Sequence, residues 1–364
     1  MGKRIIISGG GTGGHIFPAV SIAQEIRRRE PGAEILFVGA KGGMELSVVP
    51  KYGFPIESVW ISGIHRQLNV KNIGRNLLFP LKLIVSLIQS AAIVRRFRPD
   101  LVVGVGGFAS GPLGRAASGK GIPLFLCEQN AYPGLVNRWL AKNATRILLG
   151  NEDAARYFPQ DKTIVTGNPI RSFETMSREQ GCKIMGLDPS KPVVLSLGGS
   201  LGALRLNHAW EAGYQQILDA NIQLVWQSGR RYFDNLSARV GQHAGMQLLP
   251  FIDNMAAAYA AADLVVSRAG GSTISELIAL SKPSILVPSP NVSEDHQTKN
   301  ALSLSEKAAA VLVKDADAEA SLVKETIRVL TNESELSHLI TNINGMDKHQ
   351  AAEEIVDELF RNTY

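Results

Sequence analysis

Cysteines, long apolar runs and a leader-like start are scarce or missing in this chain of 364 residues. Its two cysteines, Cys127 and Cys182, exclude a disulfide framework and fit a reducing compartment. No uninterrupted apolar run approaches the roughly 20 residues that span a bilayer. The first residues enter an apolar strand at once, which is not typical of a signal peptide. These absences predict a cytoplasmic protein, either soluble or peripheral to a membrane.

Acidic residues are missing between Glu57 and Asp100. The Lys and Arg residues in that window are Arg66, Lys71, Arg75, Lys82, Arg95, Arg96 and Arg98. The net charge of +5 hides this asymmetry, because residues 1–170 hold 21 Lys and Arg against 10 Asp and Glu, whereas residues 171–364 hold 17 against 23. A first half this basic predicts an anionic partner, which could be nucleic acid, anionic lipid or a multiply charged substrate.

Apolar strand-like runs alternate with helical stretches along both halves. The expected strands are residues 3–8, 33–39, 101–105, 123–127, 146–149 and 163–166, then 192–197, 222–227, 247–249, 263–267 and 283–287. Continuous Val, Ile and Leu in such strands favours parallel sheets covered on both faces. We therefore predict an α/β protein of two Rossmann-like, doubly wound parallel-sheet domains facing a central cleft, residues 1–168 and 169–346, followed by an amphipathic helix in 347–364.

A glycine-rich turn, Ser8–His15, follows the apolar run Ile5–Ile7 and has five glycines in the six positions from Gly9 to Gly14. Glycine lets the backbone approach a ligand closely, and a helix starting near Pro18 would point its N–H groups at the same space. Such a unit is typical of an anion site. Similar turns recur at Gly106–Gly111 and Gly198–Ala203, and three of them favour a phosphorylated ligand.

Signatures of the common nucleotide enzymes are incomplete. The spacing Gly9-x-Gly11-x-x-Gly14 fits the dinucleotide fingerprint, but the second strand ends in Phe37–Lys41 without the acid that would hold the ribose. No glycine turn closes with Gly-Lys-Ser/Thr, which excludes a kinase-type P-loop. No His, Cys and Asp cluster has metal-ligand spacing. Neither a cofactor nor a metal is expected.

The segment Arg268–Glu276 follows the expected strand 263–267 and is more specific. Two glycines allow close backbone approach, and Glu276 would lie one turn into a helix on the side of Thr273. A carboxylate there suits two ribose hydroxyls, with Arg268 or the helix end on phosphate. A plain capping box, with Thr273 as cap, explains the pattern equally well. Asp253 is expected to cap a helix over residues 254–262.

The most apolar stretch, Leu77 to Val94, is interrupted by Pro80 and Lys82 and ends at Arg95 and Arg96. One interpretation is a helix that covers the sheet. The other is an interfacial patch, in which apolar residues enter the headgroup region and flanking cations meet anionic lipid. The patch would comprise Arg75, Leu77, Leu78, Phe79, Lys82, Arg95 and Arg96. Both interpretations remain open.

Several motifs occur in an order that resembles a known family. They are residues 10–15 (GGTGGH), 106–112 (GGFASGP), 128–130 (EQN), 167–171 (GNPIR), 198–203 (GGSLGA), 251–253 (FID), 268–276 (RAGGSTISE) and 295–297 (DHQ). Together they resemble glycosyltransferase family 28, the cell-wall N-acetylglucosamine transferases that make lipid II. The resemblance covers residues 3 to about 310, and Phe108 stands where some members are expected to have Tyr.

The resemblance implies the two-domain GT-B fold, with a C-terminal helix that returns to the first domain. It implies inverting, metal-independent transfer of N-acetylglucosamine from UDP-N-acetylglucosamine to the 4-hydroxyl of the muramyl sugar of lipid I. Glu276 would hold the ribose, Ile252 the uracil, and Ser200 and Thr273 the diphosphate. The expected donor-binding residues are Thr12, Gly13, Gly14, Asn130, Arg171, Ser200, Ile252, Gly271, Ser272, Thr273, Ile274, Ser275, Glu276 and Gln297.

Two residues are candidates for the catalytic base on the acceptor hydroxyl. His15 follows the first glycine turn, and an unperturbed histidine titrates near neutrality. It could instead only order the turn through a hydrogen bond. Glu128 is the alternative base, or else a buried partner of an arginine.

The acceptor, a lipid that carries a diphosphate and a peptide, would explain the basic first half. Its diphosphate is expected at the second turn, on Gly106, Gly107, Ser110 and Gly111. The patch would hold the protein on anionic lipid at the cytoplasmic face of the membrane, and membership of a cell-wall synthesis complex stays open.

Three rival functions are weighed. Another GT-B enzyme, a glycolipid transferase or a UDP-sugar 2-epimerase, would share the donor, but an epimerase leaves the basic apolar patch unexplained. A non-catalytic UDP-sugar-binding scaffold is disfavoured because His15, Glu128 and Glu276 are all present. Nucleic-acid binding is not expected, because the basic half lacks interleaved aromatic residues and any recognised module.

Overall fold

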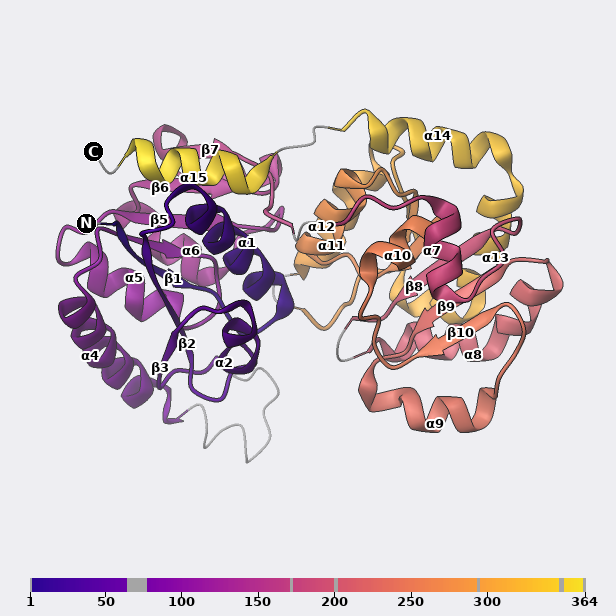
Figure 1. Ribbon diagram of the computed structural model, residues 1–364, viewed down its shortest axis with the longest axis horizontal. Helices are drawn as coiled ribbons and strands as arrows, with labels where there is room; N and C mark the ends of the chain where they lie inside the picture. The colour runs from indigo at the N-terminus through magenta and orange to yellow at the C-terminus, as the bar shows by residue number, and fades with distance from the viewer. Residues whose placement is uncertain are drawn as a thin grey trace. The chain divides into compact units, whose positions relative to one another are not determined.

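The computed structural model describes residues 2–63, 77–170, 173–199, 202–292, 295–346 and 350–362. The chain forms two compact units. The first comprises Met1–Arg171 together with His349–Tyr364, and the second comprises Ser172–Lys348. Figure 1 shows a sheet with helices packed around it in each unit. The C-terminal segment therefore belongs to the same unit as the N-terminus.

The first unit contains a parallel sheet of seven strands in the order β3-β2-β1-β4-β5-β6-β7. The strands are β1 (Arg4–Ser8), β2 (Glu34–Ala40), β3 (Ile56–Val59), β4 (Leu101–Gly104), β5 (Leu124–Glu128), β6 (Arg146–Leu149) and β7 (Thr163–Val165). The strand order reverses direction between β1 and β4, which makes this the topological switch point of the sheet.

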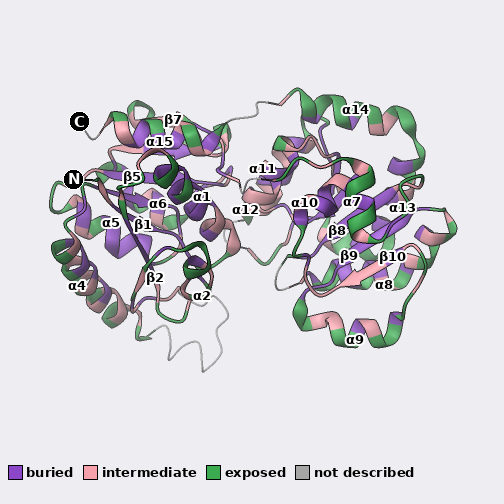
Figure 2. Ribbon diagram, viewed as in Figure 1, coloured by how far each residue is buried: buried purple, intermediate pink, exposed green. Residues whose placement is uncertain are grey.

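Alternate side chains of β1 face two separate cores. Ile5 and Ile7 pack with residues of α1 (Gly13–Arg29) and α15 (Ala351–Arg361). Ile6 packs with residues of α4 (Phe79–Phe97), α5 (Ser110–Ser118) and α6 (Leu135–Leu140). This period of two explains the continuous apolar runs, because both faces of the sheet are covered. Figure 2 shows buried residues along the strands accordingly.

The second unit repeats this plan with a parallel sheet of six strands in the order β10-β9-β8-β11-β12-β13. The strands are β8 (Val193–Leu197), β9 (Gln223–Gln227), β10 (Met246–Leu249), β11 (Leu264–Ser267), β12 (Ser284–Leu286) and β13 (Val311–Leu312). Here the order reverses between β8 and β11, so each unit has one switch point.

Helices cover both faces of the second sheet as well. One core includes residues of α7 (Arg178–Met185), α10 (Met255–Ala261), α11 (Gly271–Ala279) and α12 (His296–Ser305). The other includes residues of α8 (Leu204–Asp219), α9 (Arg230–Val240) and α13 (Ala318–Thr331), and α14 (Glu333–Asn344) contributes to both. The short helices are α2 (Glu45–Val48), η1 (Val49–Tyr52), η2 (Ala141–Asn143), η3 (Glu152–Tyr157), η4 (Gln160–Lys162) and η6 (Asp315–Asp317).

Helix α15 packs against α1 within the first unit. Arg29 near the end of α1 pairs with Asp357 and donates to the Glu353 carbonyl at 3.2 Å. Arg29 and Arg28 also pair with Glu25, and the hydrogen bond from Arg28 is the chief reason that the pKa of Glu25 lies below its ordinary value. Apolar packing and ion pairs together hold the C-terminal helix on α1.

Several local predictions were wrong. The first helix starts at Gly13, not near Pro18, and the tail helix starts at Ala351. Asn254 rather than Asp253 caps α10, because its side chain accepts from the Ala257 N–H at 2.9 Å. Strands β3 and β13 were not anticipated, since each is short and borders its sheet. Among the described residues, no helix is long and apolar enough to cross a membrane.

Candidate functional site

The glycine turns singled out from the sequence lie at the two switch points. In the first unit, β1 and β4 are neighbours, with Ser8 aligned with Gly104, so the turns that follow these strands meet. In the second unit, β8 and β11 are neighbours, with Leu197 aligned with Ser267. Open parallel sheets bind ligands at the carboxyl ends of strands at such points. Each unit therefore offers one candidate site, and the fold determines its position.

The two turns of the first unit form one packed structure. Gly106 and Gly107 have φ angles of 103° and 86°, which side chains rarely adopt. A Cβ on Gly107 would lie 2.5 Å from the Gly10 oxygen, and one on Gly106 would lie 2.6 Å from the His15 ring. Only glycine fits at these positions, because the backbone of one turn lies directly on the other turn.

His15 lies in the first turn of α1, half-buried, and its Nδ1 is 3.0 Å from the Gly10 carbonyl oxygen. A carbonyl can only accept, so Nδ1 carries the proton of this bond. In the neutral ring Nε2 then has the lone pair. The bond orders the turn, as the alternative interpretation expected, and it also places His15 in the tautomer that a base acting through Nε2 requires.

Glu128 ends β5 and is buried, with an exposed fraction of 3%. Its Oε1 accepts from the Asn130 backbone and side chain, at 3.1 and 3.0 Å. Its Oε2 accepts from Gly134 N and Asn137 Nδ2, both at 2.9 Å. Four donors on one carboxylate occupy its lone pairs. This geometry supports a role in orienting Asn130 more than a role as base, and the carboxylate partners are amides rather than the arginine considered from the sequence.

Glu45 lies beside the first glycine turn and is a residue of the candidate site that the sequence analysis missed. It is fully buried, and its carboxylate accepts from Gly11 N at 3.0 Å and from Ala40 N at 2.8 Å. The acid that seemed to be missing after the second strand is thus present, five residues beyond Ala40, but it binds the glycine turn. No local pattern in the sequence signalled this role, because the glycines at 10, 39 and 43 surround Glu45 only in the folded structure.

The expected acceptor-diphosphate residues have different surroundings. Ser110 is buried and its hydroxyl lies 2.8 Å from the Gly106 oxygen and 3.1 Å from the Ser8 oxygen, so it fastens the two turns. Gly106 and Gly111 are buried too, whereas Gly107 is half-buried and Phe108 is 49% exposed. The Ser110 hydroxyl is therefore bonded within the fold, and Gly107 and Phe108 are the accessible part of this turn. That this turn meets the acceptor diphosphate stays a prediction.

In the second unit, the β11–α11 turn differs from the capping box considered above. Gly270 is the N-cap of α11 and has no side-chain cap, so Thr273 does not cap the helix. The helix start leaves backbone N–H groups available for an anion. Asn300 on α12 donates to the Ala269 carbonyl at 3.0 Å and holds the turn in place.

Glu276 lies in the second turn of α11 and is 8% exposed. Tyr259 on α10 donates to its Oε2 at 2.7 Å, and the Tyr259 ring meets Phe173 edge to face at 5.4 Å. A carboxylate that is buried and oriented by a tyrosine is suited to a specific ligand contact. Glu276 therefore takes no part in capping α11.

The remaining donor-binding candidates divide into three groups. Ile252 and Ile274 are core side chains, so only their backbones could contact a ligand. Gln297 accepts from Ser289 N at 2.8 Å, and Ser275 donates to the Gly271 carbonyl at 3.1 Å. Thr12, Gly13, Gly14, Ser272 and Thr273 lie at helix starts, exposed or half-buried. Arg171 and Ser200 lie outside the described residues, as does Arg75 of the patch.

Arg268 is engaged within the fold. It pairs with Asp315 of η6 and donates to the Val287 carbonyl at 3.0 Å. Its side chain is only 18% exposed. The helix end rather than Arg268 is therefore the better candidate for phosphate.

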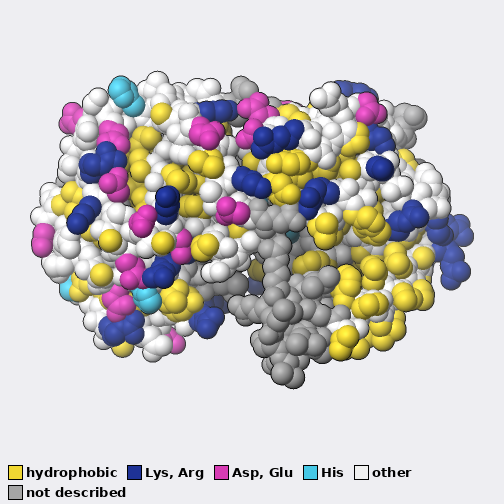
Figure 3. Space-filling view, turned by 180° about the vertical axis from the view of Figure 1, so that it is seen from behind, with side chains coloured by type: hydrophobic (Ala, Val, Ile, Leu, Met, Phe, Trp, Pro, Cys, Tyr) yellow, Lys and Arg dark blue, Asp and Glu magenta, His cyan; other side chains and the backbone are white. Residues whose placement is uncertain are grey.

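The stretch from Leu77 to Val94 forms a helix that covers the sheet and also exposes apolar side chains, so the membrane interpretation stays a prediction. Helix α4 buries Ser86, Ser90, Ile93 and Val94 against the first sheet. Its outer side exposes Leu77, Leu78, Leu81, Ile84 and Ile88, at 46–76%. Figure 3 shows hydrophobic side chains gathered on the surface of the first unit. A covering helix would not need this second apolar face.

Most other residues of the predicted patch make contacts within the first unit. Phe79 packs against the core, and Lys82 donates to the Ser62 hydroxyl at 2.9 Å. Arg96 pairs with Glu57, whose carboxylate raises the pKa of the guanidinium. Arg95 is exposed. The patch is thus mainly apolar, and its charge is weaker than the sequence indicated.

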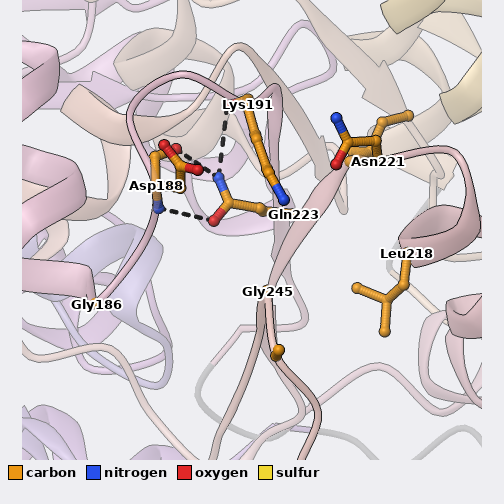
Figure 4. A pocket seen from close by; sticks show the side chains of 9 residues that line it. Gly186, Asp188, Lys191, Leu218, Asn221, Gln223 and Gly245 are labelled. Carbon is orange, nitrogen blue, oxygen red and sulfur yellow. Dashed lines mark hydrogen bonds between the residues drawn. The ribbon is translucent and has the colours of Figure 1, made fainter.

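A surface pocket in the second unit lies away from the switch point. Figure 4 shows Gln223 at the start of β9 exchanging two hydrogen bonds with Asp188, at 2.8 and 2.7 Å. Lys191 and Gly245 also line it. It borders the amino ends of the strands, where this fold does not place its ligands. Within the described ranges no group of three or more His, Cys, Asp or Glu side chains could hold a metal ion.

Comparison with known proteins matches this chain to one family along most of its length. Residues 5–149 match the model of the glycosyltransferase family 28 N-terminal domain, and residues 193–358 match that of the family's C-terminal domain. Proteins from Cytophaga hutchinsonii and Christiangramia forsetii are 46% and 45% identical to this chain, each over 98% of it and over 96% and 97% of their own length. Both are named UDP-N-acetylglucosamine–N-acetylmuramyl-(pentapeptide) pyrophosphoryl-undecaprenol N-acetylglucosamine transferase.

Solved structures confirm the fold class. The crystal structure of Acinetobacter baumannii MurG superposes with a TM-score of 0.77 at 26% identity, covering 99% of both chains. A UDP-N-acetylglucosamine 2-epimerase superposes with a TM-score of 0.66 at 11% identity, over 100% of this chain and 97% of its own, which indicates the fold alone. The prediction of two doubly wound parallel-sheet domains of the GT-B type is confirmed.

Proposed function

Because the chain belongs to glycosyltransferase family 28, we propose that it transfers N-acetylglucosamine from UDP-N-acetylglucosamine to the 4-hydroxyl of the muramyl sugar of lipid I, giving lipid II. The observation that carries this proposal is identity of about 45% over nearly the whole length of relatives named for that transfer. Three of the motifs that carry the likeness, residues 10–15, 106–112 and 268–276, follow strands of the two switch points, where the fold puts ligands.

The second unit binds the nucleotide in this proposal. The uncapped start of α11 meets the diphosphate, with its N–H groups and the positive end of the helix dipole. The buried Glu276 carboxylate, held by Tyr259, accepts from the ribose hydroxyls. Ile252 offers backbone groups to uracil. N–H groups that meet the diphosphate charge in this way stabilise the UDP leaving group as its bond to the sugar breaks.

His15 is the catalytic base in this proposal. Its Nε2 removes the proton of the acceptor 4-hydroxyl while that oxygen forms a bond to C1 of the N-acetylglucosamine. The C1–oxygen bond to the diphosphate breaks on the opposite face, UDP leaves with the electron pair, and the configuration at C1 inverts. Support comes from the Nδ1 hydrogen bond to the Gly10 carbonyl, which puts the proton of the neutral ring on Nδ1.

The lipid-linked acceptor meets the first unit. The accessible residues of the second turn, Gly107 and Phe108, are candidates for contact with its diphosphate and sugar. Asn130, oriented by Glu128, contributes an amide at the end of the neighbouring strand β5. The buried Ser110 and Gly111 support this surface from below.

The apolar side of α4 binds the cytoplasmic face of the membrane peripherally. Leu81, Ile84 and Ile88 would enter the headgroup region, with Arg95 on anionic lipid. Replacing Leu81, Ile84 and Ile88 together by Gln is expected to weaken co-sedimentation with phosphatidylglycerol vesicles about tenfold or more. Ile184→Gln with Ile340→Gln, which removes exposed apolar residues of the second unit, is the matched control. Equal sedimentation of both variants would refute this surface.

The transfer itself is tested with labelled UDP-N-acetylglucosamine and a lipid I analogue. We expect a labelled disaccharide–lipid product and stoichiometric UDP. Release of UDP with no acceptor-dependent product, or conversion of the donor to its 2-epimer, would assign the chain to a different reaction on the same fold.

A further inference from the structure

Glu45 has no part in the catalytic scheme above, yet it is among the most enclosed ionisable residues of the first unit. Its exposed fraction is zero. A Cβ on Gly10 or Gly43 would lie 2.3 Å from its Oε1, and one on Gly39 would lie 2.5 Å from its Cγ. Three backbone segments thus leave room for this one side chain. Burying a carboxylate is costly, so its retention needs a reason beyond packing.

The two groups that Glu45 and His15 contact belong to a single peptide bond. Gly11 N donates to Glu45 Oε2 at 3.0 Å, and the Gly10 carbonyl oxygen accepts from His15 Nδ1 at 3.0 Å. A trans peptide points its N–H and its C=O in opposite directions. The carboxylate and the imidazole therefore occupy the two ends of one planar, polarisable unit.

We propose that Glu45 is a positioning residue for His15, acting through the Gly10–Gly11 peptide unit to fix the Nδ1–H tautomer and to stabilise the imidazolium formed when Nε2 takes up a proton. This inference rests on the proposed role of His15 as base. The carboxylate draws the Gly11 proton toward itself, which increases the negative charge on the Gly10 oxygen. The stronger acceptor holds the Nδ1 proton more tightly and makes Nε2 more basic.

A carboxylate that accepts a hydrogen bond directly from imidazole would have the same effect. Here the Gly10–Gly11 peptide unit lies between the two side chains, since it is hydrogen-bonded to the Glu45 carboxylate on one side and to the His15 ring on the other. The second bond of Glu45, from Ala40 N at 2.8 Å, ties the turn to the end of β2. His15 is thus held by a chain of contacts that begins on a neighbouring strand.

The glycine turns that pack on this histidine carry no charge of their own. The two turns packed around it, residues 8–14 and 104–110, contain no ionisable side chain. Lys41 adjoins Ala40 and is exposed, and Glu128 at the end of β5 gives its oxygens to Asn130, Gly134 and Asn137. Glu45 reaches His15 through two hydrogen bonds that share one peptide unit, which is how its charge would alter the proton affinity of His15.

The test is nitrogen-15 NMR of the full chain labelled at its seven histidines, with His15 assigned by the signal that His15→Gln removes. In the wild type we expect the neutral His15 ring to be protonated at Nδ1. In Glu45→Gln we expect the pKa of His15 to fall by about half a unit or more, because the negative charge is lost. The acid limb of the kcat/KM profile should move to lower pH by the same amount. Glu34→Gln, which removes an exposed charge from the other end of β2, should change neither.

An unchanged pKa of His15 in folded Glu45→Gln would reduce Glu45 to a packing residue and overturn the proposal. If that variant does not fold, the wild type alone decides, because a neutral ring protonated at Nε2 contradicts the inference. Full activity of His15→Ala would instead remove the proposed role of His15 as base while leaving the Glu45 result intact, so the two failures are distinguishable.

Discussion

The two switch points share a topology but differ in how they use their polar groups. In the first unit, Glu45, Glu128 and Ser110 are buried, and their bonds go to nearby backbone and amide groups. In the second, α11 begins at an uncapped glycine and its one buried carboxylate, Glu276, is held by a tyrosine. Internal hydrogen bonds occupy the polar side chains of the first site, whereas the second site contains a helix start that no side chain caps. In the proposed function, side chains held in this way suit proton transfer, and a helix start suits the binding of a nucleotide diphosphate.

The largest effect should come from the first switch point. His15→Ala is expected to lower kcat about 10²- to 10⁴-fold, because a positioned base contributes that much, while the KM for UDP-N-acetylglucosamine stays within about twofold. Steady-state kinetics at saturating acceptor measures both. A rise in KM with unchanged kcat would place His15 in donor binding, and the two switch points would then no longer have different roles.

The two cysteines report the stability of each unit separately. Burial raises the pKa of Cys127 in the first unit to about 12, and it raises that of Cys182 in the second. Both thiols therefore react only after local opening. UDP at about 100 times its Kd should slow labelling of Cys182 about a hundredfold, and that of Cys127 much less. Selective protection of Cys127 by UDP would place the nucleotide on the first unit and contradict the proposal.

A smaller change tests how Glu276 is oriented. Tyr259→Phe removes the 2.7 Å hydrogen bond to its carboxylate and should raise the KM for UDP-N-acetylglucosamine about three- to tenfold, with little change in kcat. Tyr214→Phe, on α8 with its ring against His243, is the matched control. Equal KM values in the two variants would mean that the tyrosine only fills space.

The smallest effect concerns the anchoring of α15 on the first unit. The pKa of Glu25 is lowered by its bonds to Arg28 and Arg29, so its contribution is present above the unfolded pKa and is lost as the pH falls through the folded one. Between pH 5 and 3 the free energy of unfolding should therefore fall less in Glu25→Gln than in the wild type, by about 0.5 kcal/mol. Urea denaturation at both pH values measures the difference, and parallel losses would exclude Glu25 from the acid response.

Local patterns in the sequence predicted the sheets, because a strand buried on both faces needs a continuous apolar run. Local patterns did not predict features that depend on contacts between residues far apart in the sequence. Gly13 and Gly14 begin α1 although glycine disfavours helices, since close packing at the turn outweighs propensity. Glu45 looked like an ordinary helix residue because its partner Gly11 is 34 positions away. The alternatives for Arg268–Glu276 could not be separated until Gly270 proved to be the cap and Tyr259 the partner of Glu276.

Calorimetric titration with UDP tests the division of labour most directly, because UDP binds without any transfer. The account predicts that His15→Ala binds UDP with the Kd of the wild type, whereas Glu276→Ala binds it about tenfold or more weakly, since the ribose hydroxyls lose a charged acceptor. Wild-type affinity in Glu276→Ala together with weakened binding in His15→Ala would contradict it, and would return the nucleotide to the first glycine turn.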